Sequence, residues 1–208
     1  MSFPSTTIKI CGIGSQEDLQ AAHAAGADMV GFVRATGSPR MLDRERAQEL
    51  TSLAPDTLQT VGVYVDPTTE EPAALPTNWI QLHGSESPEE VTRIARHAAN
   101  ARVIRGFHFQ EDACHLWDQH QDVDLLLIDG PRAGSGQTFD HEQLIDIMEG
   151  LKTPVIVAGG LNPDTVHEVV QRVRPFGVDV SSGVESAPGQ KDNALIAAFC
   201  QAVRSAEK

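Results

Sequence analysis

The sequence contains few of the residues that mark a disulfide-stabilised or membrane-bound protein. Its three cysteines, Cys11, Cys114 and Cys200, are an odd number at wide and irregular spacing. No apolar run approaches the roughly 18 residues that span a bilayer, and the first residues lack a basic segment followed by an apolar core. We therefore expect a cytoplasmic protein with reduced cysteines and no membrane partner.

Basic residues are also scarce. The chain has 16 Lys and Arg against 29 Asp and Glu, a formal net charge of -13. This charge repels nucleic acid and anionic lipid, so we expect a small-molecule ligand and no nucleic-acid partner. An anionic ligand would need a local basic group or backbone dipoles to bind against the overall field.

Short β-branched or aliphatic runs recur along the chain, and stretches of helical period separate most of them. The runs cover residues 6–11, 29–33, 59–65, 79–83, 102–108, 124–129, 154–159 and 177–182. Strands that alternate with helices form parallel sheets covered on both faces. Eight such units predict an α/β fold, a single (β/α)8 TIM barrel over residues 1–208. A doubly wound sheet is the alternative, but the "CGIGSQ" segment matches its glycine fingerprint only weakly.

The third helix of this barrel is expected to be short or irregular. Residues 66–78 contain Pro67, Pro72 and Pro76. Proline inside a helix costs about 3 kcal/mol because it removes a donor and clashes with the preceding turn.

Catalytic side chains of this fold lie at the carboxyl ends of the strands. Side-chain alternation directs Lys9 and Cys11 into the barrel at the end of the first strand, and Asp129 into it at the end of the sixth. Cys11 is either a small buried apolar residue or a reactive thiol. Asp129 is either a loop cap or a proton-transfer group.

Two glycine-bearing turns follow the last two strands. Gly159 and Gly160 stand in the first turn, and Ser181, Ser182 and Gly183 in the second. Ordinary tight turns are one interpretation. Backbone N–H groups after strands seven and eight of a TIM barrel also bind phosphate, and the pair of turns favours this second interpretation.

Two further residues stand at the predicted mouth of the barrel. Arg40 follows the second strand on a proline-stiffened loop, where it is either a ligand for a carboxylate or a solvated surface residue. His83 ends the fourth strand and is interpreted as a positioning residue. No histidine or acidic pair with metal-ligand spacing accompanies it, so we predict no metal site.

With these residues identified, the chain resembles the phosphoribosylanthranilate isomerase family of tryptophan biosynthesis. The resemblance runs from the first strand to the last helix, and its final segment is the most specific. The matching segments are "KICGI" (9–13), "GFV...SPR" (31–40), "VGVYVD" (61–66), "IQLHG" (80–84), "LLIDG...GSGQTFD" (126–140), "AGGLNP" (158–163) and "GVDVSSGVESAPGQKD" (177–192).

The resemblance implies a cofactor-free Amadori rearrangement of a phosphoribosyl amine. In this interpretation Asp129 is the general acid and Cys11 the general base. Arg40 binds the anthranilate carboxylate, and the two glycine turns bind the phosphate. Asp179 orients the amine or a hydroxyl of the substrate. A thiol base needs a pKa below the usual ~8.5, which inward Lys9 or a nearby hydrogen-bond donor would lower.

Other interpretations remain open at this stage. The family usually carries an apolar residue at the position of Arg34, so a related isomerase with an altered aglycone is one alternative. A non-catalytic phosphosugar-binding barrel is another. We expect a monomer or a homodimer.

Overall fold

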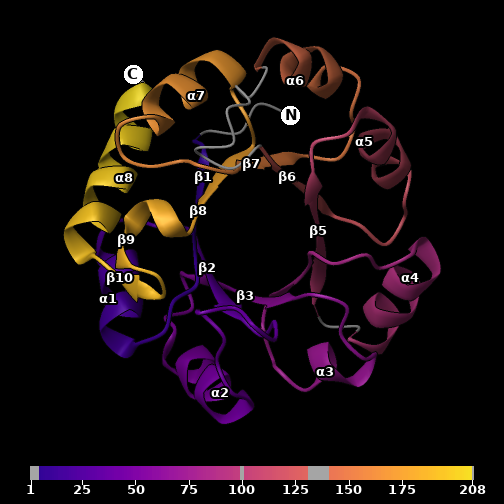
Figure 1. Cartoon of the computed structure of the whole chain (residues 1–208), viewed down its shortest axis with the longest axis horizontal. Coiled ribbons are helices and arrows are strands. Elements are labelled where there is room, and N and C mark those ends of the chain that lie inside the picture. The colour runs from indigo at the N-terminus through magenta and orange to yellow at the C-terminus, as the bar shows by residue number, and fades with distance from the viewer. Residues whose placement is uncertain (1–4, 99–100, 131–140, 208) are drawn as a thin grey trace.

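Eight parallel strands close into a barrel, with the helices arranged around its outside (Figure 1). The computed structural model describes residues 5–98, 101–130 and 141–207. The strands follow one another around the barrel in chain order, and β8 pairs with β1 to close it. The predicted (β/α)8 fold is confirmed. The strands are β1 (Thr7–Cys11), β2 (Met29–Val33), β3 (Gln59–Tyr64), β4 (Trp79–Leu82), β5 (Arg102–His108), β6 (Leu125–Asp129), β7 (Val155–Ala158) and β8 (Gly177–Val180).

Local capping signals determine where several helices begin. Ser15 and Ser87 each accept a hydrogen bond from the backbone of the third helical residue and form capping boxes with Asp18 and Glu90. The helices are α1 (Gln16–Ala24), α2 (Arg44–Leu53), α3 (Glu70–Ala73), α4 (Pro88–His97), α5 (Glu111–Asp118), α6 (His141–Met148), α7 (Val166–Val173) and α8 (Asn193–Ala206). None of the helices in the described ranges is long and apolar enough to cross a membrane.

The third helix is reduced to one turn, as predicted. α3 has four residues, Pro72 is its third residue, and the Thr69 side chain makes no capping hydrogen bond. Because proline disrupts a helix interior, the polypeptide passes between β3 and β4 with little regular structure.

The alternating side chains of the strands form two apolar layers. Ile8 and Ile10 of β1 belong to the outer layer, between the sheet and the helices. Cys11 belongs to the inner layer, with Leu125 and Leu127 of β6. The predicted inward direction of Cys11 is therefore confirmed, and the apolar side chains below it fill the barrel as a packed core.

The connection from β8 to α8 is more regular than a simple turn. It contains the 3₁₀ helix η1 (Ser182–Val184) and a short antiparallel pair, β9 (Glu185–Ala187) and β10 (Gln190–Lys191). Gly189 between these strands has φ +81°, and a Cβ there would lie 2.5 Å from the carbonyl oxygen of Pro39. The hairpin thus packs closely against the loop that follows β2.

Candidate active site

Cys11 lies at the carboxyl end of β1 and is 7 % exposed. Gly31 on the neighbouring strand pairs with it in register. A Cβ on Gly31 would lie only 3.0 Å from the Cys11 Sγ. The missing side chain at Gly31 therefore leaves the space that the thiol occupies.

A buried ion pair lies next to the thiol. Lys9 Nζ is 2.7 Å from Asp179 Oδ1, and the two residues are 0 % and 8 % exposed. Burial lowers the pKa of Lys9, but Asp179 and Cys11 outweigh burial and hold this pKa above its ordinary value. Lys9 is therefore a fixed positive charge inside the barrel. Asp179 lies where the sequence predicts, but its carboxylate is already bound to Lys9.

The acidity of Cys11 differs from the sequence-based expectation. Burial raises the pKa of the thiol, and Asp179 raises it further, while Lys9 and Lys191 lower it. Lys9 therefore lowers the pKa as expected, but the net pKa stays above its ordinary value, so the lowered pKa that a resting thiolate base requires is not found. The physical reason is that Cys11 is enclosed by low-dielectric protein and that Asp179 offsets much of the charge of Lys9.

Asp129 ends β6 with its side chain 26 % exposed, at the same end of the barrel as Cys11. His108 on the adjacent strand approaches it, with 3.7 Å between Nδ1 and Oδ2. Gly159 has φ +92°, and a Cβ there would lie 2.7 Å from Asp129 Oδ1. Gly159, predicted for phosphate binding, therefore also makes room for the carboxylate. The "GSGQTFD" part (134–140) of the matching segment 126–140 lies outside the described residues.

His83 follows β4, and its ring contacts the side chain of Gln81 on that strand. The Gln81 amide nitrogen lies 3.0 Å from His83 Nδ1, and a Cβ on Gly106 would lie 2.5 Å from the same nitrogen. Burial lowers the pKa of His83 to about 4. The ring is therefore neutral near pH 7. In the three described ranges no group of three or more His, Cys, Asp or Glu side chains could hold a metal ion.

Arg40 is not a solvated surface residue. It donates from Nε to Glu185 Oε1 and from Nη2 to Glu185 Oε2, each at 2.6 Å. A Cβ on Gly12 would lie 2.6 Å from Arg40 Cδ. The arginine side chain thus crosses the backbone next to Cys11. Its carboxylate-binding role stays a prediction, and one edge of its guanidinium already binds a carboxylate of the protein.

The two glycine turns pack against each other. Gly159 and Gly160 have φ +92° and +66°, values that favour glycine. A Cβ on Gly183 would collide with the carbonyl oxygen of Leu161, so the turn after β8 touches the turn after β7. Ser181 Oγ is buried without a hydrogen-bond partner among the described residues, and Ser182 begins η1. All five residues predicted for phosphate binding therefore lie in one region.

Sequence reasoning missed three polar residues of this site: Gln81, Glu185 and Lys191. Lys191 Nζ donates to Glu185 Oε1 (2.7 Å) and to the Ser181 carbonyl oxygen (2.9 Å). Glu185 and Lys191 belong to the most specific matching segment, residues 177–192, which was the available signal. Gln81 was detectable as a polar residue on an otherwise apolar strand.

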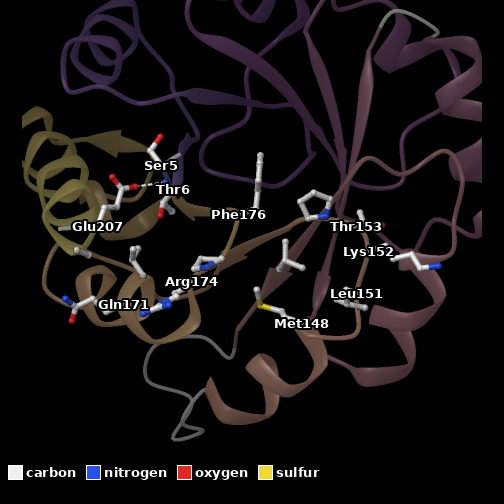
Figure 2. A pocket seen from close by; sticks show the side chains of 15 residues that line it. Ser5, Thr6, Met148, Leu151, Lys152, Thr153, Gln171, Arg174, Phe176 and Glu207 are labelled. Atoms are coloured by element: carbon white, nitrogen blue, oxygen red, sulfur yellow. Dashed lines mark hydrogen bonds between the residues drawn. The ribbon is translucent and has the colours of Figure 1, made fainter. Parts of the chain in front are cut away.

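A separate cavity lies at the opposite end of the barrel (Figure 2). Its volume is about 1230 Å³. It is lined by Ser5 and Thr6 ahead of β1 and by Thr153 and Phe176 ahead of β7 and β8. Because these segments precede the strands, the cavity lies away from Cys11 and Asp129, which end theirs.

Comparison with known proteins identifies the family of this barrel. The family model described as N-(5'phosphoribosyl)anthranilate (PRA) isomerase matches residues 8–202. The N-(5'-phosphoribosyl)anthranilate isomerase of Chromohalobacter salexigens is 41% identical over 207 residues, covering 95% of this chain and 94% of the relative.

Solved structures agree with the sequence comparison. The phosphoribosyl anthranilate isomerase of Thermotoga maritima matches with a TM-score of 0.86 and 33% identity, covering 96% of this chain and 99% of its own. A phosphoribosyl anthranilate isomerase in complex with reduced 1-(o-carboxyphenylamino)-1-deoxyribulose 5-phosphate matches with a TM-score of 0.84 and 31% identity, at the same coverage. This chain therefore belongs to the N-(5'-phosphoribosyl)anthranilate isomerase family.

Proposed function

We propose that the protein isomerises N-(5-phospho-β-D-ribosyl)anthranilate to 1-(2-carboxyphenylamino)-1-deoxy-D-ribulose 5-phosphate, a step of tryptophan biosynthesis. The observation that carries the proposal is that an inward thiol, Cys11, and a carboxylate, Asp129, end strands at the same mouth of one barrel. Family membership supports it, and so does the relative bound to a reduced form of this product.

Asp129 serves as the general acid in this proposal. It protonates the furanose ring oxygen, the C1–O bond breaks, and the anthranilate nitrogen becomes the nitrogen of a protonated Schiff base. A side chain that is 26 % exposed can exchange protons with water between turnovers. His108, at 3.7 Å, is a charged neighbour of this carboxylate whenever its ring is protonated.

Cys11 serves as the general base. It takes the proton from C2 of the sugar, and the electron pair moves toward the cationic nitrogen. The resulting enolamine is protonated at C1 while the C2 hydroxyl loses its proton, which gives the ketone. The ordinary state of the buried thiol is neutral, because burial raises its pKa. The positive Schiff base, Lys9 and Lys191 all favour the thiolate, so the base forms when the cationic intermediate is present.

The remaining predicted residues would hold the two ends of the substrate. Arg40 offers Nη1, which has no hydrogen bond to a residue in the described ranges, to the anthranilate carboxylate. The turns with Gly159, Gly160, Ser181, Ser182 and Gly183 offer backbone N–H groups to the phosphate. His83 and Asp179 line the sugar between these ends.

Two properties outside the site are also proposals. We infer a cytoplasmic location, in keeping with the absence of a membrane-crossing helix in the described part of the chain. We infer a monomer or a homodimer, and a relative from Thermotoga maritima is described as dimeric.

The proposal is tested by incubating the purified protein with N-(5-phosphoribosyl)anthranilate and following the loss of its fluorescence. C11A and D129N should each lower kcat by at least about 10², the contribution of a general acid or base. Both variants should still bind the reduced product analogue, because neither residue is placed on the phosphate or the carboxylate. A wild-type protein that binds the analogue without turnover would instead be a non-catalytic barrel, and activity only on another phosphoribosyl amine would indicate a different isomerase.

A further inference from the structure

Glu185 is a carboxylate at the mouth of the barrel for which the proposed mechanism has no role. Its side chain is 3 % exposed. It accepts hydrogen bonds from Arg40 Nε and Nη2 (both 2.6 Å), Lys191 Nζ (2.7 Å) and Gly189 N (3.3 Å). Burial opposes ionisation, but the bonds from Arg40 and Lys191 outweigh it and hold the pKa of Glu185 below its ordinary value. Glu185 is therefore a fixed negative charge.

The contacts of Glu185 determine which edge of Arg40 remains available. Nε and Nη2 form a two-point pair with the carboxylate, which fixes the plane of the guanidinium. Nη1 has no hydrogen bond to any described residue, and the Arg40 side chain is 21% exposed. The donors that remain for a ligand are therefore the two N–H groups of Nη1 and the second N–H of Nη2, at the end of the guanidinium away from the Nε–Nη2 pair.

A negative charge beside a site for an anionic ligand requires compensation. Lys191 supplies it, since its side chain is 0% exposed and its Nζ is 2.7 Å from Glu185. Arg40 and Lys191 with Glu185 carry a net charge of +1, so the cluster still attracts an anion. Lys191 also donates to the Ser181 carbonyl oxygen, which joins the cluster to the turn proposed for phosphate.

We infer that Glu185 is a positioning residue for substrate selection: it holds Arg40 by the Nε–Nη2 edge and directs Nη1 toward the aromatic carboxylate of the substrate. This inference rests on the proposed function. A long arginine side chain loses rotamer freedom when it is fixed. Glu185 fixes Arg40 before the substrate arrives, so this ordering does not weaken binding.

The test compares wild type with E185Q, which keeps the shape of the side chain and removes its charge. E49Q is the matched control, because Glu49 forms an exposed pair with Arg46 on α2 (2.7 Å). Two ligands are used: the reduced product analogue, and the same compound lacking the ortho-carboxylate. Dissociation constants are measured by calorimetry, and KM and kcat with N-(5-phosphoribosyl)anthranilate.

E185Q should weaken binding of the carboxylate analogue by about tenfold, and raise KM by a similar factor, with kcat changed by less than about threefold. Binding of the carboxylate-free analogue should change by less than about twofold, and E49Q should leave both affinities unchanged. R40K keeps the charge but not the two-point geometry. It should therefore also lose the preference for the carboxylate analogue over the carboxylate-free analogue. Combining R40K with E185Q should add little, because both changes remove one interaction.

Equal weakening of both analogues in E185Q would assign Glu185 a merely structural role and overturn the inference. Tighter binding of the carboxylate analogue would overturn it as well, because Glu185 would then oppose recognition. If E185Q does not fold, as judged by circular dichroism, unchanged discrimination in R40K refutes the inference. Loss of turnover in wild type would count against the proposed function alone, since the binding comparison needs no catalysis.

Discussion

His83 is a half-buried histidine whose ring stays uncharged near neutral pH. Burial lowers its pKa to about 4, against an ordinary value of 6.5. Between these values the unfolded chain binds a proton that the folded protein does not. The contribution of His83 to stability is therefore complete above about pH 6.5 and is lost as the pH falls toward 4.

The expected outcome is a drop of roughly 3 kcal/mol in the free energy of unfolding on acidification through this window, the scale of a shift of two to three pKa units. Urea unfolding at pH 7.5 and pH 4.5 measures it. H83N, which cannot titrate, should lose much less stability over the same range. An imidazole that titrates near its ordinary pKa by NMR would show that this account of the site is wrong.

At the scale of single elements, helix starts differ in how well they are capped. At the start of α4 the Ser87 hydroxyl accepts from Glu90 N (3.3 Å), and the Glu90 carboxylate accepts from Ser87 N (2.8 Å). At the start of α3 the Thr69 side chain makes no capping hydrogen bond. The two positions therefore form a matched pair for substitution.

S87A should lower the free energy of unfolding by about 1 kcal/mol, because the backbone N–H of Glu90 at the start of α4 loses its acceptor. T69A should change it by less than about 0.5 kcal/mol, the usual range for a surface change. Urea unfolding monitored by circular dichroism measures both. Equal losses would indicate that the capping box contributes nothing specific.

At the scale of the whole molecule, the last helix helps to close the barrel. Arg204 on α8 donates from Nη1 to the Thr6 carbonyl oxygen (2.6 Å), ahead of β1. Its Nη2 binds Asp28 Oδ2 (2.9 Å), ahead of β2. One side chain thus connects the carboxyl-terminal helix to the starts of the first two strands.

R204Q should destabilise the fold by about 1 to 3 kcal/mol, the cost of removing charge-assisted hydrogen bonds from partly buried groups. The control is R93Q, because Arg93 is 65% exposed and its pair with Glu90 spans 3.8 Å. That pair should contribute less than about 1 kcal/mol. Both are measured by thermal and urea unfolding, and a cost for R204Q no larger than for R93Q would contradict the closing role.

Sequence reasoning predicts local features well in this chain. Period-two alternation identified Cys11 as an inward residue and Ile8 and Ile10 as outward ones, because the direction of a strand side chain depends only on its position in the strand. The three prolines of residues 66–78 predicted the short α3 for an equally local reason. The net pKa of Cys11 did not follow from local pattern, because Lys9 lowers it as expected while burial and Asp179 on β8 raise it above its ordinary value.

The sequence by itself determined the eight strands, the parity of their side chains and the residues available at the mouth, since these follow from periodicity and capping within short windows. Only the tertiary structure decided which charges meet. Lys9 pairs with Asp179 across 170 positions, and Arg40 with Glu185 across 145. No local pattern encodes such pairs, because they form only when closure of the barrel brings β8 and its hairpin against β1 and the loop after β2.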